Sequence, residues 1–292
     1  MIVAVHDSES NTKYPNLALM KISAFHKAHG DTVEWFNPFF ADQYDKIYSS
    51  KVFTWTPIDP YLPERTIRGG TGYGIMNTLP DEIEHICPDY SLYPDVKSSY
   101  GFLTRGCFRA CPWCIVPKKE GKIRPHADIT EFAKHKHVTL MDNNVLACEW
   151  GLEQIDKIAG MDLRIDFNQG LDARLIDKQI ARLLARVKWI RFIRLACDSQ
   201  AQKESVKNAV ENLRLAGYKG EIFCYVLIKG IDEALDRIEF CRSIGIKPFG
   251  QPYRDFTTNK EPDIWQKRLA RYVNVKSVFE SISWGEYIEK YL

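Results

Sequence analysis

The sequence predicts an α/β protein in which a small α/β domain precedes a larger domain of repeated strand–helix units. Short apolar and β-branched runs, such as residues 190–196 and 221–228, have the length and composition of buried strands. Stretches with apolar residues at helical spacing separate them, for instance residues 201–216 and 232–243. The alternation repeats about every thirty residues, which is typical of parallel βαβ units.

The smaller domain is expected to span residues 1–95. Residues 2–5 predict a first strand, and an apolar set that begins after Pro15 predicts a helix ending near Gly30. Residues 32–36 and 47–56 predict two further strands. These elements indicate a small Rossmann-like unit, which ends in a Gly- and Pro-rich stretch.

The larger domain is expected to span residues 96–255 and to hold six βα units. Six strands are too few for a closed eight-stranded barrel, and right-handed parallel units then curl into an open, partial (β/α)6 barrel. The predicted strands are the segment before Cys107 and residues 137–141, 163–167, 190–196, 221–228 and 245–249. Residues 256–292 predict an amphipathic helical extension that covers the open edge of the barrel.

Composition places the chain among ordinary globular proteins. Of its 292 residues, 45% are hydrophobic and 27% are charged, which is enough for a sizeable core. The net charge of +2 permits nucleic-acid binding but does not indicate it. The N-terminal residues lack the features of a signal peptide, and no apolar run approaches the roughly 18 residues of a membrane span. We therefore expect a cytoplasmic protein with reduced thiols and no membrane partner.

Three cysteines lie within eight residues of the segment YGFLTRGCFRACPWCIVPKKE. Cys107, Cys111 and Cys114 are separated by three and then by two residues. Thiolates are soft ligands that suit zinc or iron–sulfur clusters. A structural zinc site normally has four ligands, and the sequence contains no second close-spaced pair. An incomplete zinc knuckle and buried thiols are the alternatives to a three-thiolate cluster.

The CxxxCxxC spacing, with the aromatic Trp113 before the last cysteine, resembles the signature of the radical S-adenosylmethionine (radical SAM) superfamily. The resemblance implies a 4Fe-4S cluster on the three cysteines, with one iron that binds SAM beside Trp113. It also implies an external electron donor and reductive cleavage of SAM to methionine and a 5′-deoxyadenosyl radical. That radical would abstract hydrogen from a small or macromolecular substrate, which the sequence does not identify. A partial barrel of six strands is the core of this family.

Asp142, Asn143 and Asn144 follow the second strand of the larger domain. In parallel βα folds, ligand sites form beyond the carboxyl ends of the strands. By the resemblance, these residues occupy the position of the family motif that holds the methionine amino group of SAM. The same residues would equally form an Asx turn and a helix cap.

The resemblance implies further SAM contacts after the third and fourth strands. Asn168 offers an amide to SAM or substrate, although a loop without a ligand role is the alternative. Asp198 and Ser199 are candidates for the SAM ribose, and Arg194 for its carboxylate. An arginine in a buried strand requires an anionic partner, which favours this role for Arg194.

After the fifth strand, Ile228 and Gly230 match the family's Ile-x-Gly-x-x-Glu element, in which the isoleucine packs on adenine. The glycine that precedes this element in the family is replaced by Val226.

Two other functions stay open. The N-terminal domain resembles that of cobalamin-binding radical SAM enzymes, which implies a cobalamin-dependent methyltransferase. However, Asp7, Ser8 and Glu9 stand where that branch has Asp-x-His-x-x-Gly, so the cobalt-ligating histidine is missing. The second alternative is a noncatalytic iron–sulfur or zinc module that binds a partner without using SAM. The strand-end polar residues argue against such a module, because a structural metal site does not need them.

Overall fold

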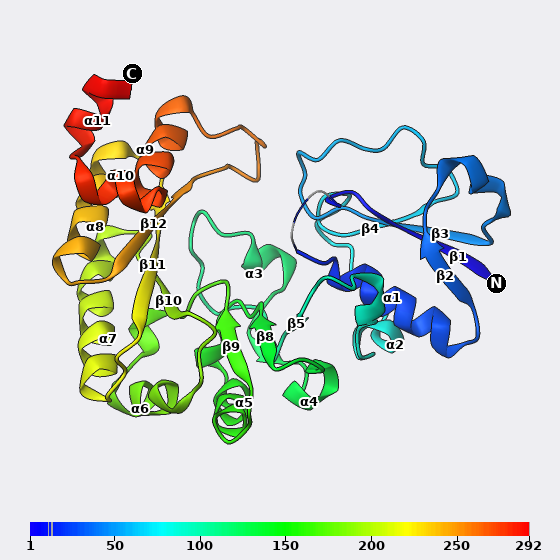
Figure 1. Cartoon of the computed structure of the whole chain (residues 1–292), viewed down its shortest axis with the longest axis horizontal. Coiled ribbons are helices and arrows are strands. Elements are labelled where there is room, and N and C mark those ends of the chain that lie inside the picture. The colour runs from blue at the N-terminus through cyan, green and yellow to red at the C-terminus, as the bar shows by residue number, and fades with distance from the viewer. Residues whose placement is uncertain (11, 13, 292) are drawn as a thin grey trace. The chain divides into compact units, whose positions relative to one another are not determined.

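The computed structural model describes residues 1–10, 12 and 14–291 and shows a mixed α/β protein with parallel sheets (Figure 1). The α/β class predicted from the sequence is confirmed. The chain forms two compact units, one of residues 1–101 and 127–136 and the other of residues 102–126 and 137–292. Leu292, the last residue of the predicted extension, lies outside the described residues.

The first unit contains a four-stranded parallel sheet with the order β2-β1-β3-β4. Its strands are β1 (Ile2–Asp7), β2 (Thr32–Trp35), β3 (Lys46–Ser50) and β4 (Ile67–Gly69). Helix α1 (Leu17–Ala28) connects β1 to β2, and its buried Leu19 and Met20 pack in one core with Val5 of β1. Asn16 caps this helix by accepting a hydrogen bond from the Leu19 amide.

The third predicted strand, residues 47–56, is shorter in the structure because the chain leaves the sheet after Ser50. The Glu9 carboxylate accepts hydrogen bonds from the amides of Val52 and Phe53, at 3.0 and 3.2 Å. These amides are therefore bonded to a side chain instead of a neighbouring strand. The other elements of this unit are η1 (Pro38–Gln43), α2 (Asp81–Glu84), η2 (Tyr90–Leu92), β5 (Ser98–Gly101) and α4 (Ile129–Phe132).

The second unit begins with a short antiparallel pair, β6 (Thr104–Arg105) and β7 (Arg124–Pro125). The segment between these strands holds the three cysteines of the motif and the single helical turn α3 (Val116–Lys119). We call residues 106–123 the cysteine loop. Its two ends are held together by the pairing of β6 with β7.

The longer strands of the second unit are parallel but do not form one continuous sheet. They are β8 (His137–Leu140), β9 (Arg164–Phe167), β10 (Phe192–Ala196), β11 (Glu221–Ile228) and β12 (Lys247–Pro252). β8 pairs with β9, and β10, β11 and β12 pair in that order. Among the described residues, two isolated bridges, Ile165 with Trp189 and Leu171 with Leu195, connect the two groups.

The break follows from the path of the chain after β9. Gly170 adopts a φ of +85°, and its amide closes a turn on the Phe167 carbonyl. The chain returns to β10 only at Leu171, whose amide donates to the Arg194 carbonyl at 2.7 Å. A positive φ is readily adopted only by glycine, so this kink is fixed by the residue type. The continuous six-stranded barrel expected from the sequence is therefore not observed.

Helices follow the parallel strands as the sequence predicts. They are α5 (Glu149–Ala159), α6 (Lys178–Arg186), α7 (Lys203–Leu215) and α8 (Ile231–Ser243), with the short turns η3 (Val145–Ala147), η4 (Ala173–Leu175) and η5 (Gln200–Gln202). Every second residue of β11 is buried, from Ile222 to Ile228, and α8 packs on this strand (Figure 1). The alternation is the period-two pattern of a strand covered on one face.

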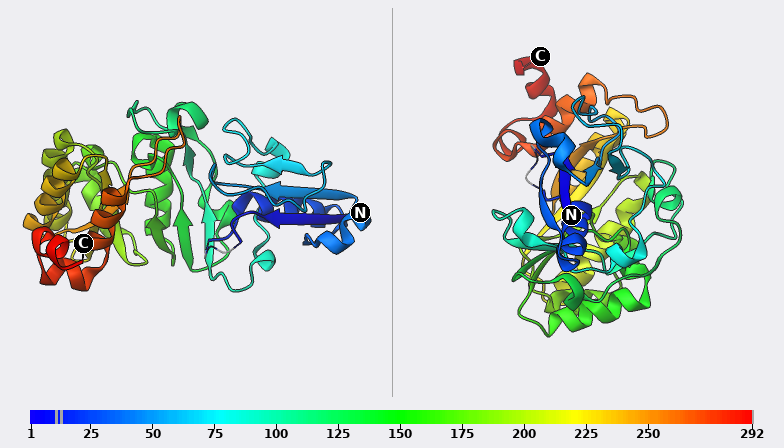
Figure 2. Two further views of the ribbon diagram at one scale, coloured as in Figure 1. Left: turned by 90° about the horizontal axis from the view of Figure 1, so that it is seen from above. Right: turned by 90° about the vertical axis from the view of Figure 1, so that its right-hand side faces the viewer.

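Three helices end the second unit: α9 (Ile264–Asn274), α10 (Lys276–Ser281) and α11 (Trp284–Tyr291). Helix α9 packs on β12, and Figure 2 shows these helices in orange and red beside that part of the unit. The Asn274 amide both accepts from the Gly250 N–H, at 2.8 Å, and donates to the Gly250 carbonyl, at 3.0 Å. It thereby satisfies backbone groups on the outer edge of β12. No helix in the described residues has the length and apolar character to cross a membrane.

Candidate functional site

The cysteine loop is shaped by Gly106, which follows β6 directly. Gly106 has a φ of +83°, and its amide donates to the Asn143 side-chain oxygen at 3.3 Å. A Cβ atom at this position would lie 2.3 Å from the Lys122 carbonyl oxygen. The next amide, that of Cys107, donates to the Gly121 carbonyl at 3.1 Å. Glycine at position 106 therefore allows the two ends of the loop to approach each other closely.

The three thiols of the loop lie near one another. Cys107 and Cys111 are half-buried, and Cys114 is exposed. The Cys107 sulfur accepts hydrogen bonds from the Arg109 amide at 3.3 Å and from the Asn144 side-chain nitrogen at 3.4 Å. Burial raises the pKa of the Cys111 thiol above its usual value, and negative charge on the neighbouring Cys107 raises it further. Trp113 lies in the turn between Cys111 and Cys114 and is half-buried.

The loop fits an iron–sulfur cluster in the chemistry of its side chains. Among the described residues, no group of three or more His, Cys, Asp or Glu side chains is arranged as a metal site. The donor type nevertheless suits the cluster, because iron–sulfur clusters are held by cysteine thiolates and three cysteines belong to this loop. Beside them, the Asn144 side-chain oxygen is buried and has no hydrogen-bond partner. A buried acceptor without a donor is rare in proteins and fits a ligand that donates a hydrogen bond there.

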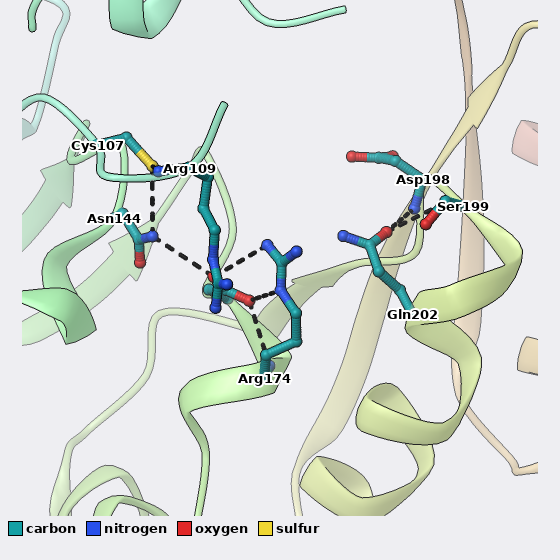
Figure 3. A network of polar contacts seen from close by, with 8 residues as sticks. Cys107, Arg109, Asn144, Arg174, Asp198, Ser199 and Gln202 are labelled. Carbon is teal, nitrogen blue, oxygen red and sulfur yellow. Dashed lines mark hydrogen bonds and ion pairs between the residues drawn. The ribbon is translucent and has the colours of Figure 1, made fainter. Parts of the chain in front are cut away.

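The carboxylate of Asp172 joins the cysteine loop to the segment after β9. Figure 3 labels three residues that donate to it, Arg109, Arg174 and Asn144. It accepts from Arg109 Nε at 3.0 Å, from Arg174 Nε and Nη2 at 2.6 and 3.0 Å, and from Asn144 Nδ2 at 3.5 Å. Burial alone would raise the pKa of Asp172, but the hydrogen bonds from Arg174 and Arg109 outweigh burial and lower it. Asp172 is therefore ionised at neutral pH and holds two cations beside the thiols.

Asp142 and Asn143 support the start of this loop. The Asp142 carboxylate is buried and accepts hydrogen bonds from the Leu103 and Thr104 amides and from the Thr104 hydroxyl, at 2.6–3.2 Å. Burial raises the pKa of Asp142 to about 6, although these hydrogen bonds oppose the shift. Because its oxygens are bonded to the backbone around β6, Asp142 positions the loop and does not face a ligand.

Asp198 and Ser199 lie at the end of β10 and start η5. The Gln202 side-chain oxygen accepts from both of their amides, at 2.6 and 3.1 Å, as Figure 3 shows. The Asp198 Oδ1 atom accepts from the Leu227 amide at 3.2 Å. Burial raises the pKa of Asp198 to about 6. The negative charge of Asp198 also raises the pKa of the Cys111 thiol.

Four predicted residues lie apart from the polar contacts around Asp172 and Asp198. Arg194 forms a bidentate ion pair with Asp166, at 2.6 and 2.7 Å, and donates to the Tyr225 hydroxyl at 3.0 Å. The anionic partner required for a buried arginine is thus a residue of β9. Asn168 accepts from the Tyr225 hydroxyl through its main-chain carbonyl at 2.8 Å.

The remaining two residues belong to the end of β11. Ile228 is fully buried, and its side chain lies against Gly250 of β12. It therefore supports the sheet instead of facing the polar group. Gly230 caps α8, and no atom lies within 4 Å of where its Cβ would stand. Open space at this position leaves room for a ligand.

Several residues of the site were not among the predicted ligands. They are Arg109, Asp172, Arg174 and Gln202. Arg109 lies inside the cysteine motif, in the sequence CFRAC, and an arginine between two closely spaced cysteines is a signal that could have been used. The direction in which Asp172 and Arg174 point depends on η4 and could not be read from their positions after the third strand.

The strand ends of the first unit do not fit cobalamin. Both ring nitrogens of His6 are engaged, one with Ser49 Oγ at 3.0 Å and the other with Asp59 Oδ2 at 3.1 Å. The Asp7 carboxylate accepts from the Glu9 amide and the Tyr93 hydroxyl, at 3.0 and 2.7 Å. His6 and Asp7 are thus bonded to groups of their own unit, and the His6 ring has no nitrogen left for a metal.

A scan against models of known protein families found no match, and a search of curated proteins found no similar protein.

Proposed function

We propose that the chain is a radical SAM enzyme. The observation that carries the proposal is the placement of Cys107, Cys111 and Cys114 in one loop beside a buried acceptor without a partner, the Asn144 side-chain oxygen. Three thiols leave one iron of a 4Fe-4S cluster without a protein ligand. The cluster and SAM together supply the chemistry, which is reductive cleavage of SAM to a 5′-deoxyadenosyl radical that abstracts hydrogen from a substrate.

In this proposal, Asn144 has two roles. Its side-chain nitrogen donates to the Cys107 sulfur and so orients a cluster ligand. Its free oxygen accepts a hydrogen bond from the SAM amino group. Arg109, Arg174 and Asp172 hold the cysteine loop against η4, and the positive charge of Arg174 partly offsets the effect of burial on the pKa of Cys111.

The remaining contacts to SAM come from the ends of β10 and β11. Asp198 accepts a hydrogen bond from a ribose hydroxyl through the carboxylate oxygen that does not face Leu227, and Ser199 lies beside it. Gly230 leaves space for the adenosyl group. Trp113 packs beside SAM from the cysteine loop. Asp142 and Asn143 position that loop from behind.

The proposal extends to the fold and the setting of the enzyme. We propose that the strands of the second unit belong to a partial barrel of the radical SAM type, interrupted at Gly170. An oxygen-sensitive cluster requires reducing surroundings, which favours the cytoplasm. Cobalamin has no part in the proposal because the residues at its expected site do not fit it.

Cluster loading and SAM binding test the proposal. After anaerobic reconstitution, we expect roughly four iron and four sulfide ions per chain, and we expect SAM to change the electron paramagnetic resonance spectrum of the reduced cluster. Alanine at position 107, 111 or 114 should abolish both results. Cys87→Ala is the matched control, because this half-buried cysteine belongs to the first unit.

Two outcomes would contradict the proposal. Zinc in place of iron would indicate a structural metal module. A complete cluster whose spectrum is unchanged by SAM would indicate an iron–sulfur protein that does not use SAM.

A further inference from the structure

We propose that one face of the cysteine loop is the docking surface for an acidic one-electron carrier protein. The inference rests on the proposed function, because a bound cluster must receive one electron from a donor before SAM is cleaved. The carrier loses one electron and the cluster gains one, and no bond or proton is exchanged. The docking surface consists of Lys118, Lys122 and Arg124 together with an apolar hollow beside them.

Positive charge is concentrated around the cysteines. Residues 105–124 contain six basic residues and one acidic residue, a net charge of +5, whereas the whole chain has a net charge of only +2. Arg105 and Arg109 are neutralised by ion pairs with Glu120 and Asp172. The excess of positive charge in this segment therefore comes from the lysines and the arginine that follow the last cysteine.

Lys118, Lys122 and Arg124 are exposed, and in the described part of the chain no ion pair joins any of them to a carboxylate. Arg124 donates instead to the Glu120 carbonyl oxygen at 2.6 Å, which fixes the direction of its side chain. Three uncompensated cations, two on the cysteine loop and one at the start of β7, produce a local positive potential. Such a potential accelerates the encounter with a partner that has an acidic surface.

An apolar hollow of about 510 Å³ adjoins these cations. Phe108, Ile123 and Leu146 line it, together with Leu152 and Leu175, and Glu149 contributes a carboxylate. Ile123 lies between Lys122 and Arg124 in the sequence, so the apolar and basic parts adjoin. Phe108 is 50% exposed although it directly follows the cluster ligand Cys107. An exposed aromatic residue that neighbours apolar side chains and is surrounded by charges is typical of an interaction surface.

The same features favour a protein over a nucleic acid. Single-stranded nucleic acids bind in grooves whose cations follow the backbone over several nucleotides. Here the exposed cations are confined to residues 118–124, and apolar side chains line most of the hollow beside them. A small apolar surface with a charged surround matches the transient complexes of redox proteins, which bury less than about 1,200 Å².

Binding of a flavodoxin, an acidic flavin-containing carrier, tests the proposal. The variant Lys118→Glu, Lys122→Glu, Arg124→Glu should bind flavodoxin at least about tenfold more weakly at low ionic strength. The matched control, Arg182→Glu, Lys207→Glu, Lys219→Glu, makes the same change of net charge at exposed positions of the same unit and should bind within about twofold of the unmodified chain. Binding is measured on the protein without a cluster, so the result does not depend on enzymatic activity.

Reduction of the reconstituted cluster provides the second readout. In the variant with Glu at positions 118, 122 and 124, flavodoxin should reduce the cluster about tenfold more slowly than in the unmodified chain. Dithionite, a small reductant that needs no docking surface, should reduce the cluster of both proteins at the same rate. Phe108→Ala should weaken flavodoxin binding several-fold without changing its dependence on salt, because it removes apolar contact and no charge.

If the Lys118→Glu, Lys122→Glu, Arg124→Glu variant and its control bind flavodoxin equally well, the proposal is overturned. It is also overturned if the unmodified chain binds an oligonucleotide more tightly than flavodoxin. If Glu substitutions disturb the loop, the neutral variant Lys118→Gln, Lys122→Gln, Arg124→Gln should still lose affinity. Failure of the proposed function gives a different result, namely that the cluster is reduced by dithionite but no SAM is cleaved.

Discussion

At the scale of single residues, Asp172 is the carboxylate on which the site depends. It neutralises two arginines from different segments and reaches the amide that contacts Cys107. The cations exceed the anion in number, so the group as a whole is positive. The charge of Arg174 lowers the pKa of Cys111, but burial outweighs it, and the pKa of that thiol stays above its usual value.

Replacing Asp172 with asparagine should destabilise the second unit. Breaking a buried ion pair by removing one partner costs about 3–5 kcal/mol, but Arg109 and Arg174 are 28% and 30% exposed, so we expect about 2 kcal/mol. Urea unfolding measures the loss. The control is Asp156→Asn. Asp156 pairs with Arg186, and both side chains are exposed, so this substitution should lower the free energy of unfolding by less than about 0.5 kcal/mol. Equal effects of the two substitutions would contradict the role of Asp172.

Asp142 should make stability depend on pH. Its pKa is raised to about 6 in the folded chain, so the folded state binds the proton more tightly than the unfolded state, where the pKa has its ordinary value of 3.8. The contribution of this carboxyl to stability is greatest below pH 3.8 and falls as the pH rises through about 6, by about 3 kcal/mol in total.

The comparison with Asp142→Asn isolates this effect, because asparagine does not titrate. We expect the free energy of unfolding of the unmodified chain, relative to that of Asp142→Asn, to decrease between pH 4 and pH 7. A difference that is constant over this range would mean that the carboxyl has an ordinary pKa in the folded protein.

At the scale of elements, the β6–β7 pair determines where the cysteines lie. The loop that joins the two strands contains Gly106, directly after β6, and Gly121, three residues before β7. Both glycines have a positive φ. Their surroundings differ, because a Cβ at position 106 would meet the Lys122 carbonyl at 2.3 Å whereas nothing lies within 4 Å at position 121. A substitution at position 121 therefore introduces backbone strain alone, whereas a substitution at position 106 introduces both backbone strain and a close contact.

Gly106→Ala should prevent assembly of the cluster, because the clash with the backbone forces the two ends of the loop apart. Gly121→Ala should cost only about 1–2 kcal/mol from the left-handed conformation and should retain iron. Iron content after reconstitution measures both outcomes. Full iron loading of Gly106→Ala would show that the close approach of the loop ends is not required.

The elements themselves were largely predictable, because burial imposes regular patterns on the sequence. The apolar run at residues 221–228 predicted β11, and the apolar spacing around Leu19 predicted α1. The end of β3 was not predictable, since it depends on Glu9, about forty residues away in the sequence. The break at Gly170 was likewise hidden, because periodicity reports which residues are buried and not which strands pair.

For the site, the sequence identified the residue types and the strand ends but not the directions of the side chains. The Asn144 amide contacts the Cys107 sulfur, and the charge of Asp198 raises the pKa of Cys111. Arg194 was expected at the SAM carboxylate, but Asp166 on the neighbouring strand holds it. Whether a strand residue faces a ligand or an adjacent strand depends on tertiary pairing, which one sequence does not specify.

At the scale of the whole molecule, the two units differ in how their strand ends are used. In the first unit, Asp7, Glu9 and His6 are bonded to neighbouring groups of the same unit. In the second, the Asn144 side chain contacts the Cys107 sulfur through its nitrogen and has a buried oxygen without a partner. We therefore assign the chemistry to the second unit and a supporting role to the first.

Formation of 5′-deoxyadenosine is the most direct test of this assignment. The reconstituted protein is reduced with dithionite under anaerobic conditions, given SAM, and assayed for 5′-deoxyadenosine and methionine. We predict that both products form with the unmodified chain and with Cys87→Ala, and that neither forms with Cys107→Ala, Cys111→Ala or Cys114→Ala. Products that persist in the three cysteine variants, or a fully loaded and reduced cluster that leaves SAM intact, would contradict the assignment.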